Sequence, residues 1–386
     1  SISYSVAVSG SFAYVVNGGS NTLQSFNISN PAAPTLVGTS ATGTSPSSVA
    51  VSGSRVFVTN GVSNTLLIFN TSSGSPTPLG SVATASGPVS VAVSGQFAYV
   101  VSYNLSRLQV FNISNPFAPT LAGSVFTGGF SPVSVAVSGS FAYVVNQDSN
   151  TLQVINISNP AAPTLAGIIA TDSAPTAVAV SGSFAYVVNA GSNTLQAFNI
   201  SNPAAPALAG SIATGSGPQS VVVSGAFAYL VVGALASPGT LQVFSVSNPA
   251  AMTLSGSIAT GPKPKAVTVS GLFAYVLAND SQTMQIFSAL PRVGFGTSLS
   301  ASTLSGVSGA GLTNLNAASI ASGTVDNART SGTNLGTPGT LVLRDGSGNF
   351  SAGTITASLS GNATTATNAA TATNATLLSG QPASFY

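Results

Sequence analysis

Residues 133–160 read VSVAVSGSFAYVVNQDSNTLQVINISNP, and variants of this stretch recur along the first three quarters of the chain. Each variant contains Val-Ser-Gly, and its seven copies begin at Val8, Val51, Val93, Val137, Val180, Val223 and Val269. Successive copies are 43, 42, 44, 43, 43 and 46 residues apart. A period of this size that carries several short strands is typical of a propeller blade. The sequence therefore predicts an all-β fold, with a seven-bladed β-propeller over residues 1–290.

The fourth repeat shows how one blade is built. Alternating or β-branched residues occupy 134–138, 141–146, 151–157 and 164–171, which predicts four strands. Turn-forming residues separate them, and Pro160 ends the third strand because proline has no N–H to donate to a sheet. No helical period appears in residues 1–290. The recurring Phe-Ala-Tyr-Val supplies large side chains that fill the wedge between neighbouring blades.

The units of the form Tyr-Val-Val-Asn-x-x-Ser-Asn-Thr-Leu-Gln-Val-Phe-Asn-Ile-Ser-Asn-Pro resemble the repeats of bacterial surface propellers of the YVTN and LVIVD type. The resemblance covers about residues 1–290. It implies a propeller fold and an extracellular or cell-surface location, and it names no activity. The chain departs from that group in its turns, where Ser-Gly-Ser and Gly-Ser-Asn replace the charged and Asp-Gly residues.

The seventh repeat is incomplete. After Phe287-Ser288 the Asn-Pro-Ala-Ala-Pro linker is missing, and the chain continues through Arg292, Val293 and Phe295. Either residues 292–299 form the outer strand of this blade, or its edge stays open for a strand from another molecule, since an unpaired edge favours β-augmentation. Phe287, Arg292, Val293 and Phe295 are therefore candidate assembly residues.

Residues 291–386 form a second segment of different composition, rich in Gly, Ala, Thr and Asn. Such a segment cannot bury enough apolar surface to offset about 1–2 kcal/mol of backbone entropy per residue. We therefore expect an extended, β-rich, low-complexity tail that becomes ordered against other copies of the chain. Residues 363–376 fit a thin helix or an extended strand, and the pattern does not choose between them.

The tail also contains a predicted hairpin around Asp345-Gly346, flanked by Leu341-Val342-Leu343 and Phe350. Residues 304–386 resemble the shaft segments of phage tail fibres and bacterial fibre proteins, and this resemblance implies an intertwined homotrimer. The large side chains of the tail are its candidate assembly residues: Leu341, Leu343, Phe350, Phe385 and Tyr386.

The amino-acid composition limits the classes of protein to which this chain can belong. Only 3% of the residues are charged, and the chain contains no Glu, His, Cys or Trp. A surface with so little charge offers little electrostatic repulsion between copies, which favours a secreted, self-associating protein. No stripe of basic residues could follow a nucleic acid backbone, and no apolar run approaches the roughly 18 residues of a membrane span. Because Ser1 opens the chain, we take it as processed or as part of a longer product.

The sequence contains few residues of the types that act in catalysis. Without His or Cys, the nucleophile arrangements that depend on them are excluded, as are most transition-metal sites. Asp148, Asp172 and Asp280 fall in different repeats and are interpreted as turn residues. We therefore expect no enzyme activity, no metal and no cofactor.

Two loops break the repeat and are candidate recognition loops. One contains Tyr103 and Arg107 and the other contains Leu235. Tyr103 could stack on a sugar ring, with drift between repeats as the alternative. Four Asn-Ile-Ser sequons recur at the end of the third strand, at Asn27, Asn112, Asn156 and Asn199. Their repetition favours a turn role, with glycosylation as the alternative.

These observations favour a structural subunit of an extracellular fibre or filament, which assembles through its tail and through strand donation to the seventh blade. The alternative is an adhesin or tail-fibre-like protein whose propeller recognises a cell-surface glycan or protein. An enzyme is the third and least favoured class.

Overall fold

The computed structural model describes residues 3–233, 238–279, 283–289, 377–378 and 381–382. The chain divides into two units, Ser1–Leu299 and Ser300–Tyr386. In the second unit the described residues are two short antiparallel strands, β28 (Leu377–Leu378) and β29 (Gln381–Pro382). The rest of the predicted tail, and residues 292–299 of the seventh repeat, lie outside the described residues.

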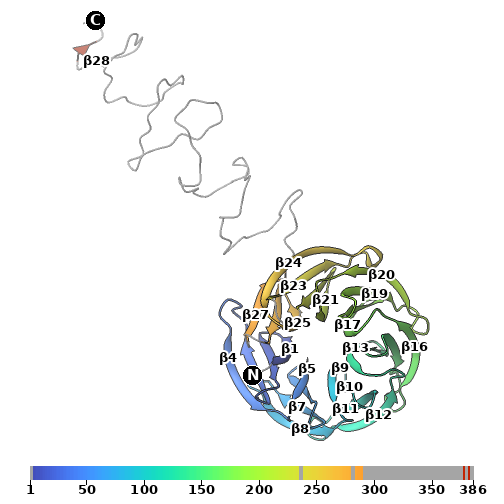
Figure 1. Ribbon diagram of the computed structural model, residues 1–386. Helices are drawn as coiled ribbons and strands as arrows, with labels where there is room; N and C mark the ends of the chain where they lie inside the picture. Colours follow the sequence, from blue (N-terminus) through green and yellow to red (C-terminus); the bar gives the residue numbers. More distant parts are fainter. Residues whose placement is uncertain (1–2, 234–237, 280–282, 290–376, 379–380, 383–386) are drawn as a thin grey trace. The chain divides into compact units, whose positions relative to one another are not determined.

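The first unit is an all-β propeller of seven blades, in which each blade is an antiparallel sheet with its strands in sequence order (Figure 1). Blade 1 comprises β1 (Ser3–Ser9), β2 (Phe12–Asn17), β3 (Thr22–Asn27) and β4 (Thr35–Ala41); blade 2, β5 (Pro46–Ser52), β6 (Arg55–Asn60), β7 (Thr65–Asn70) and β8 (Thr77–Ala83). Blade 3 comprises β9 (Pro88–Ser94), β10 (Phe97–Ser102), β11 (Arg107–Asn112) and β12 (Thr120–Phe126); blade 4, β13 (Pro132–Ser138), β14 (Phe141–Asn146), β15 (Thr151–Asn156) and β16 (Thr164–Ala170).

Blade 5 comprises β17 (Pro175–Ser181), β18 (Phe184–Asn189), β19 (Thr194–Asn199) and β20 (Ala207–Ala213); blade 6, β21 (Pro218–Ser224), β22 (Phe227–Val232), β23 (Pro238–Ser245), the 3-10 turn η1 (Pro249–Ala251) and β24 (Thr253–Pro262). Blade 7 has three described strands, β25 (Pro264–Ser270), β26 (Phe273–Ala278) and β27 (Thr283–Ser288).

The predicted propeller is confirmed, and the four strands expected in the fourth repeat differ from β13–β16 by at most two residues at any end.

The innermost strands form a closed ring, because β1 lies beside both β5 and β25. Serines join neighbouring blades within this ring. The Ser134 hydroxyl accepts a hydrogen bond from the Val178 N–H of the next blade at 3.3 Å, and four other junctions repeat the contact. The N–H groups on the inner edge of a blade have no neighbouring strand to pair with, so these serines satisfy donors that the sheets leave open.

The second strand of each blade carries the core. Every residue of β14 after Phe141 is buried, and the second strands of the other blades follow the same pattern. Tyr143 and Val145 pack with Val178 and Val187 of the next blade, so the hydrophobic clusters lie between blades. The prediction that Phe-Ala-Tyr-Val fills the wedges is confirmed.

Candidate functional site

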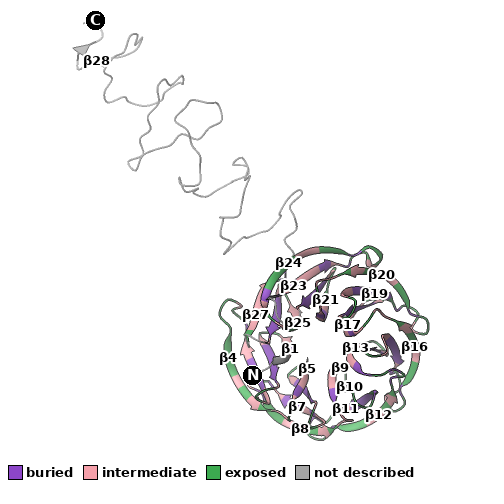
Figure 2. Ribbon diagram, in the orientation of Figure 1, coloured by how far each residue is buried: buried purple, intermediate pink, exposed green. Residues whose placement is uncertain are grey.

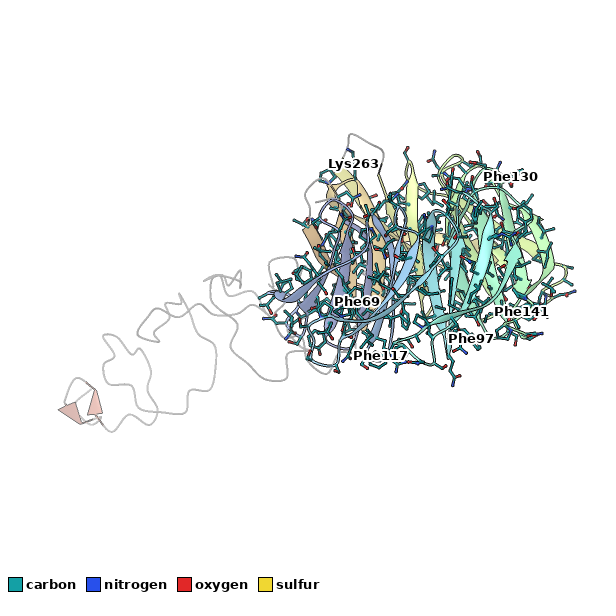
Figure 3. All side chains as sticks on the ribbon, turned by 90° about the horizontal axis from the view of Figure 1, so that it is seen from below. Phe69, Phe97, Phe117, Phe130, Phe141 and Lys263 are labelled. Carbon is teal, nitrogen blue, oxygen red and sulfur yellow. The ribbon has the colours of Figure 1, made fainter. Side chains whose placement is uncertain are left out.

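The two ends of the propeller carry different connections. One end, which we call the inter-blade face, carries the loops between blades and the turns between second and third strands. The other end, the proline-loop face, carries the Ser-Gly turns and the Asn-Pro loops. Figure 3 shows Phe130 and Lys263 at the inter-blade face, and Phe97, Phe117 and Phe141 toward the proline-loop face.

Blade 3 departs from the repeat at the inter-blade face. In blades 4 and 5 an Asn with a positive φ ends the turn before the third strand, and its side chain supports the following loop. Asn150 Oδ1 accepts from the Ala174 N–H at 2.7 Å, and Asn193 Oδ1 accepts from the Gly217 N–H at 2.7 Å. Ser106 takes this place in blade 3, and no such side-chain bond joins it to the described loop that follows.

That following loop, residues 127–131, has one residue more than the next inter-blade loop, residues 171–174. The turn of blade 4 holds it in place. The Ser149 hydroxyl accepts from the Phe130 N–H at 2.6 Å, and the Ser131 hydroxyl donates to the Asp148 carboxylate at 2.5 Å. Two contacts from blade 4 therefore present Phe130 on an anchored loop.

The inserted residue has a second effect, on the buried amide of Gln153. In blade 5 the equivalent Gln196 Oε1 accepts from the inter-blade Asp172 N–H at 2.9 Å. Neither amide atom of the fully buried Gln153 has a hydrogen-bond partner among the described residues. The longer loop has thus lost the contact that the shorter loop makes.

Several exposed apolar side chains lie on the inter-blade face, in the turn and outer strand of blade 3 and in the loop to blade 4. Phe130 is 69% exposed, Leu105 52%, Phe126 50% and Tyr103 37%. Arg107 pairs across the sheet with Phe126 and donates to the Ser124 hydroxyl at 3.4 Å. We call Tyr103, Leu105, Arg107, Phe126 and Phe130 the blade 3 patch. Exposed rings with polar neighbours can stack on the apolar face of a sugar or pack against a protein partner.

The sequence prediction found part of this patch. Tyr103 and Arg107 lie on it, whereas Leu235 is outside the described residues. Phe126 and Phe130 were not among the predicted recognition residues. The sequence did indicate a longer loop here, since the third and fourth Val-Ser-Gly copies are 44 residues apart, one more than the 43 residues between the fourth and fifth copies.

The four repeated sequons occupy equivalent turns. Asn156 Oδ1 accepts from the N–H two residues on, that of Ser158, at 2.9 Å. Asn27, Asn112 and Asn199 make the same contact with Ser29, Ser114 and Ser201. These Asx turns provide the structural role that the repetition predicts. Glycosylation of the four residues stays a prediction.

The candidate assembly edge is β27. Its central residues Met284, Gln285, Ile286 and Phe287 are only half-buried, whereas the central residues of the equivalent β15 are all buried. No described strand pairs with the outer edge of β27, which accounts for the difference. The other assembly candidates, Arg292, Val293, Phe295, Leu341, Leu343, Phe350, Phe385 and Tyr386, lie outside the described residues.

The charged groups of the inter-blade face support loops. Asp148 accepts from Ser131, and Asp172 accepts from the Thr194 hydroxyl at 2.7 Å. Lys265 donates to Gln219 Oε1 at 2.9 Å, and desolvation by the surrounding protein lowers the pKa of this lysine. Within the described ranges, no three His, Cys, Asp or Glu side chains gather as metal ligands, and no helix is long and apolar enough to cross a membrane.

A family model of the LVIVD repeat matches residues 2–42, 88–127, 132–171, 175–214 and 217–260, more than half of the chain. No curated protein matches the sequence. The matched stretches correspond to blades 1 and 3–6.

Solved structures share the fold at low identity. A functionally unknown protein from Desulfotomaculum acetoxidans is 18% identical with a TM-score of 0.63, over 72% of this chain and 92% of its own. A protein from Lactobacillus plantarum is 17% identical with a TM-score of 0.61, over 74% and 90%. A candidate 6-phosphogluconolactonase from Bacteroides fragilis is 19% identical with a TM-score of 0.60, over 74% and 90%. At these identities the likeness is one of fold.

Proposed function

Because the chain belongs to the LVIVD-repeat family of β-propellers, a fold that serves as a scaffold for many functions, we propose that it is a structural subunit of an extracellular fibre or filament. The chain assembles through its C-terminal tail, and the open edge of blade 7 provides a second contact between copies. No enzyme activity is part of this proposal. One structural relative is named a 6-phosphogluconolactonase, but the two proteins share only the fold at 19% identity, so that activity is not proposed for this chain.

The observation that carries the proposal is the outer rim of the propeller. The outer strands β4, β8, β12, β16, β20 and β24 contain no charged residue, and only two of them contain a proline, Pro78 in β8 and Pro262 at the end of β24. Sheet edges that avoid association usually carry charged residues or proline. Leucines at equivalent positions on this rim are 47–54% exposed: Leu36, Leu121, Leu165, Leu208 and Leu254. Figure 2 shows these outer strands as exposed and half-buried around the ring.

The edge of β27 supports the same proposal. A neighbouring strand would bury Met284 and Ile286, which are half-buried, and would pair the outer backbone groups of the strand. The composition of the tail supports it, since a segment predicted to bury little apolar surface alone gains a core by packing with other copies. A weakly charged, cysteine-free chain is consistent with an extracellular location.

The test is the mass and shape of the purified chain, by light scattering and negative-stain imaging, with and without residues 291–386. We expect polymers from the full chain and a monomeric propeller from the shortened one. Because so few charges are involved, the polymers should persist from about 0.05 to 1 M salt, across which ionic contacts weaken. A full-length chain that stays monomeric would contradict the proposal.

The blade 3 patch favours a second candidate, an adhesin whose propeller binds a cell-surface glycan or protein. Its exposed rings are held on an anchored loop, which lowers the entropy lost on binding. A discrete trimer that displays three propellers would favour this candidate over a filament. Binding to cells or to a glycan array should then fall in a Tyr103→Ser, Phe130→Ser variant and stay unchanged in Leu208→Ser, which alters the rim. Equal binding by both variants would rule out the patch.

A further inference from the structure

At one position of the repeat, six blades have an aromatic residue and the remaining blade has a charged one. The second strand begins with phenylalanine in six blades, at Phe12, Phe97, Phe141, Phe184, Phe227 and Phe273. Blade 2 has Arg55 instead. An aromatic wedge has thus been replaced by a permanently charged guanidinium with five N–H donors.

The phenylalanine normally seals the gap between its own blade and the next. Phe97 packs against the cluster between blades 3 and 4, and Phe141 against the cluster between blades 4 and 5. The cluster between blades 2 and 3 contains no side chain from the equivalent position. Its proline-loop end therefore carries a half-buried arginine where the other clusters carry a half-buried phenylalanine.

A pocket lies at this point. Its volume is about 230 Å³, and it is lined by Ser52, Arg55, Phe57, Gly95, Gln96, Ile113 and Ser114. Phe57 and Ile113, which are 1% and 4% exposed, form the narrow apolar floor of the pocket, whereas Gln96 and the two serines provide hydrogen-bonding groups. Pockets that enclose drug-sized ligands measure about 300–1,000 Å³, so this one has room for a single ring.

The charge of Arg55 is not used by the described protein. The side chain has no hydrogen bond or ion pair with any described residue. The other described charged residues, Arg107, Asp148, Asp172, Lys263 and Lys265, occupy turns, loops and strand ends of the opposite, inter-blade face. Arg55 is thus the one described charge on the proline-loop face, and an anion in the pocket would meet no described carboxylate there.

We propose that this pocket binds an acidic monosaccharide unit, a pyranose ring that bears a carboxylate. The guanidinium of Arg55 pairs with the carboxylate, because its parallel N–H groups match the two oxygens. The C–H face of the sugar packs against Phe57 and Ile113. Its hydroxyls bond with Gln96, Ser52 and Ser114. A simple inorganic anion would leave the apolar floor unused.

The test uses the full chain and isothermal titration calorimetry with glucuronate, glucose and inorganic phosphate. We expect glucuronate to bind and the other two to bind at least tenfold more weakly, since a hydrogen bond to a charged group is worth roughly that factor. Equal binding of phosphate would overturn the sugar assignment, and no binding of glucuronate at about 20 mM, well above the millimolar range of weak ligands, would overturn the site.

Arg55→Phe is the decisive variant, because it restores the residue of the other six blades. It should abolish glucuronate binding without lowering the melting temperature. Arg55→Gln, which keeps a polar side chain, should weaken binding by more than about tenfold and serves if the phenylalanine variant misfolds. Lys263→Gln removes a positive charge from the opposite face, outside the blade 3 patch, and should leave binding unchanged. Unchanged binding in both Arg55 variants would overturn the proposal.

Discussion

At the scale of single residues, the glycine of Thr-Leu-Ala-Gly makes room for the neighbouring blade. A Cβ built on Gly123 would lie 2.5 Å from the Pro160 carbonyl oxygen and 2.6 Å from that of Ala161. Gly256, the same position in blade 6, meets no atom of the described residues within 4 Å, and the loop that would reach it is the one missing from the seventh repeat. The Asn-Pro loop of one blade therefore needs glycine in the blade before it.

We predict that Gly123→Ala lowers the free energy of unfolding by about 1–3 kcal/mol, because backbone atoms must move to admit the methyl group. Gly256→Ala should change it by less than about 1 kcal/mol, with a gain expected from the lower entropy of the unfolded chain. Urea denaturation of the two variants measures the difference. A comparable loss in Gly256→Ala would mean that another segment packs on this glycine.

The amide of Gln153, which has no described partner, leads to the prediction of a stabilising substitution. Gln153→Leu should raise the free energy of unfolding by about 1 kcal/mol, because it removes a buried polar group that has no described partner. Blade 2 already carries Leu67 at this position. Gln196→Leu should cost about 1–2 kcal/mol, since it leaves the Asp172 N–H without its acceptor. A loss in Gln153→Leu would show that bound water satisfies the amide.

At the scale of strands, the positions of the strands could be predicted, because the same pattern of residues occurs in seven repeats and a strand that is unclear in one repeat is clear in another. Alternation and β-branching located β13–β16 to within two residues at every end. The patch and the pocket were harder to find, because they depend on contacts between blades. Arg55 is visible in the sequence, but only the packing of blade 2 on blade 3 shows that its substitution opens a pocket.

The ring of innermost strands carries its own prediction. Ser134→Ala removes the acceptor of the Val178 N–H and should lower the free energy of unfolding by about 1 kcal/mol. Blade 5 has Ala177 at the equivalent position, so Ala177→Ser should add the contact with the Val221 N–H and raise stability by a similar amount. Urea midpoints of the two variants should move in opposite directions. A fall in both would show that packing at this position outweighs the hydrogen bond.

At the scale of the whole molecule, the scarcity of ionisable groups sets the response to pH. The chain contains no His and no Glu, so no side chain with an ordinary pKa titrates between about pH 5 and 8. Five tyrosines lie buried at one position of the second strand in blades 3–7, and burial raises the pKa of each: Tyr99, Tyr143, Tyr186, Tyr229 and Tyr275. Among the described residues they are the main groups that couple folding to pH.

We therefore predict that the free energy of unfolding is flat from about pH 5 to 9 and falls above pH 10. A raised pKa in the folded state means that the unfolded chain loses its tyrosine protons first. Their contribution is complete below the ordinary tyrosine pKa of about 10 and is lost as the pH rises through the folded values. The lowered pKa of Lys265 acts in the opposite direction, but it is one group against five.

Urea midpoints between about pH 5 and 11.5, followed together with tyrosinate absorbance, measure this dependence across the ordinary tyrosine pKa. Tyr143→Phe removes one of the five groups and should make the alkaline decline shallower, because one proton fewer is released on unfolding. Arg107→Gln changes an exposed charge and should leave the slope unchanged. A decline that begins near pH 7 would mean that a charged contact beyond the described residues controls folding.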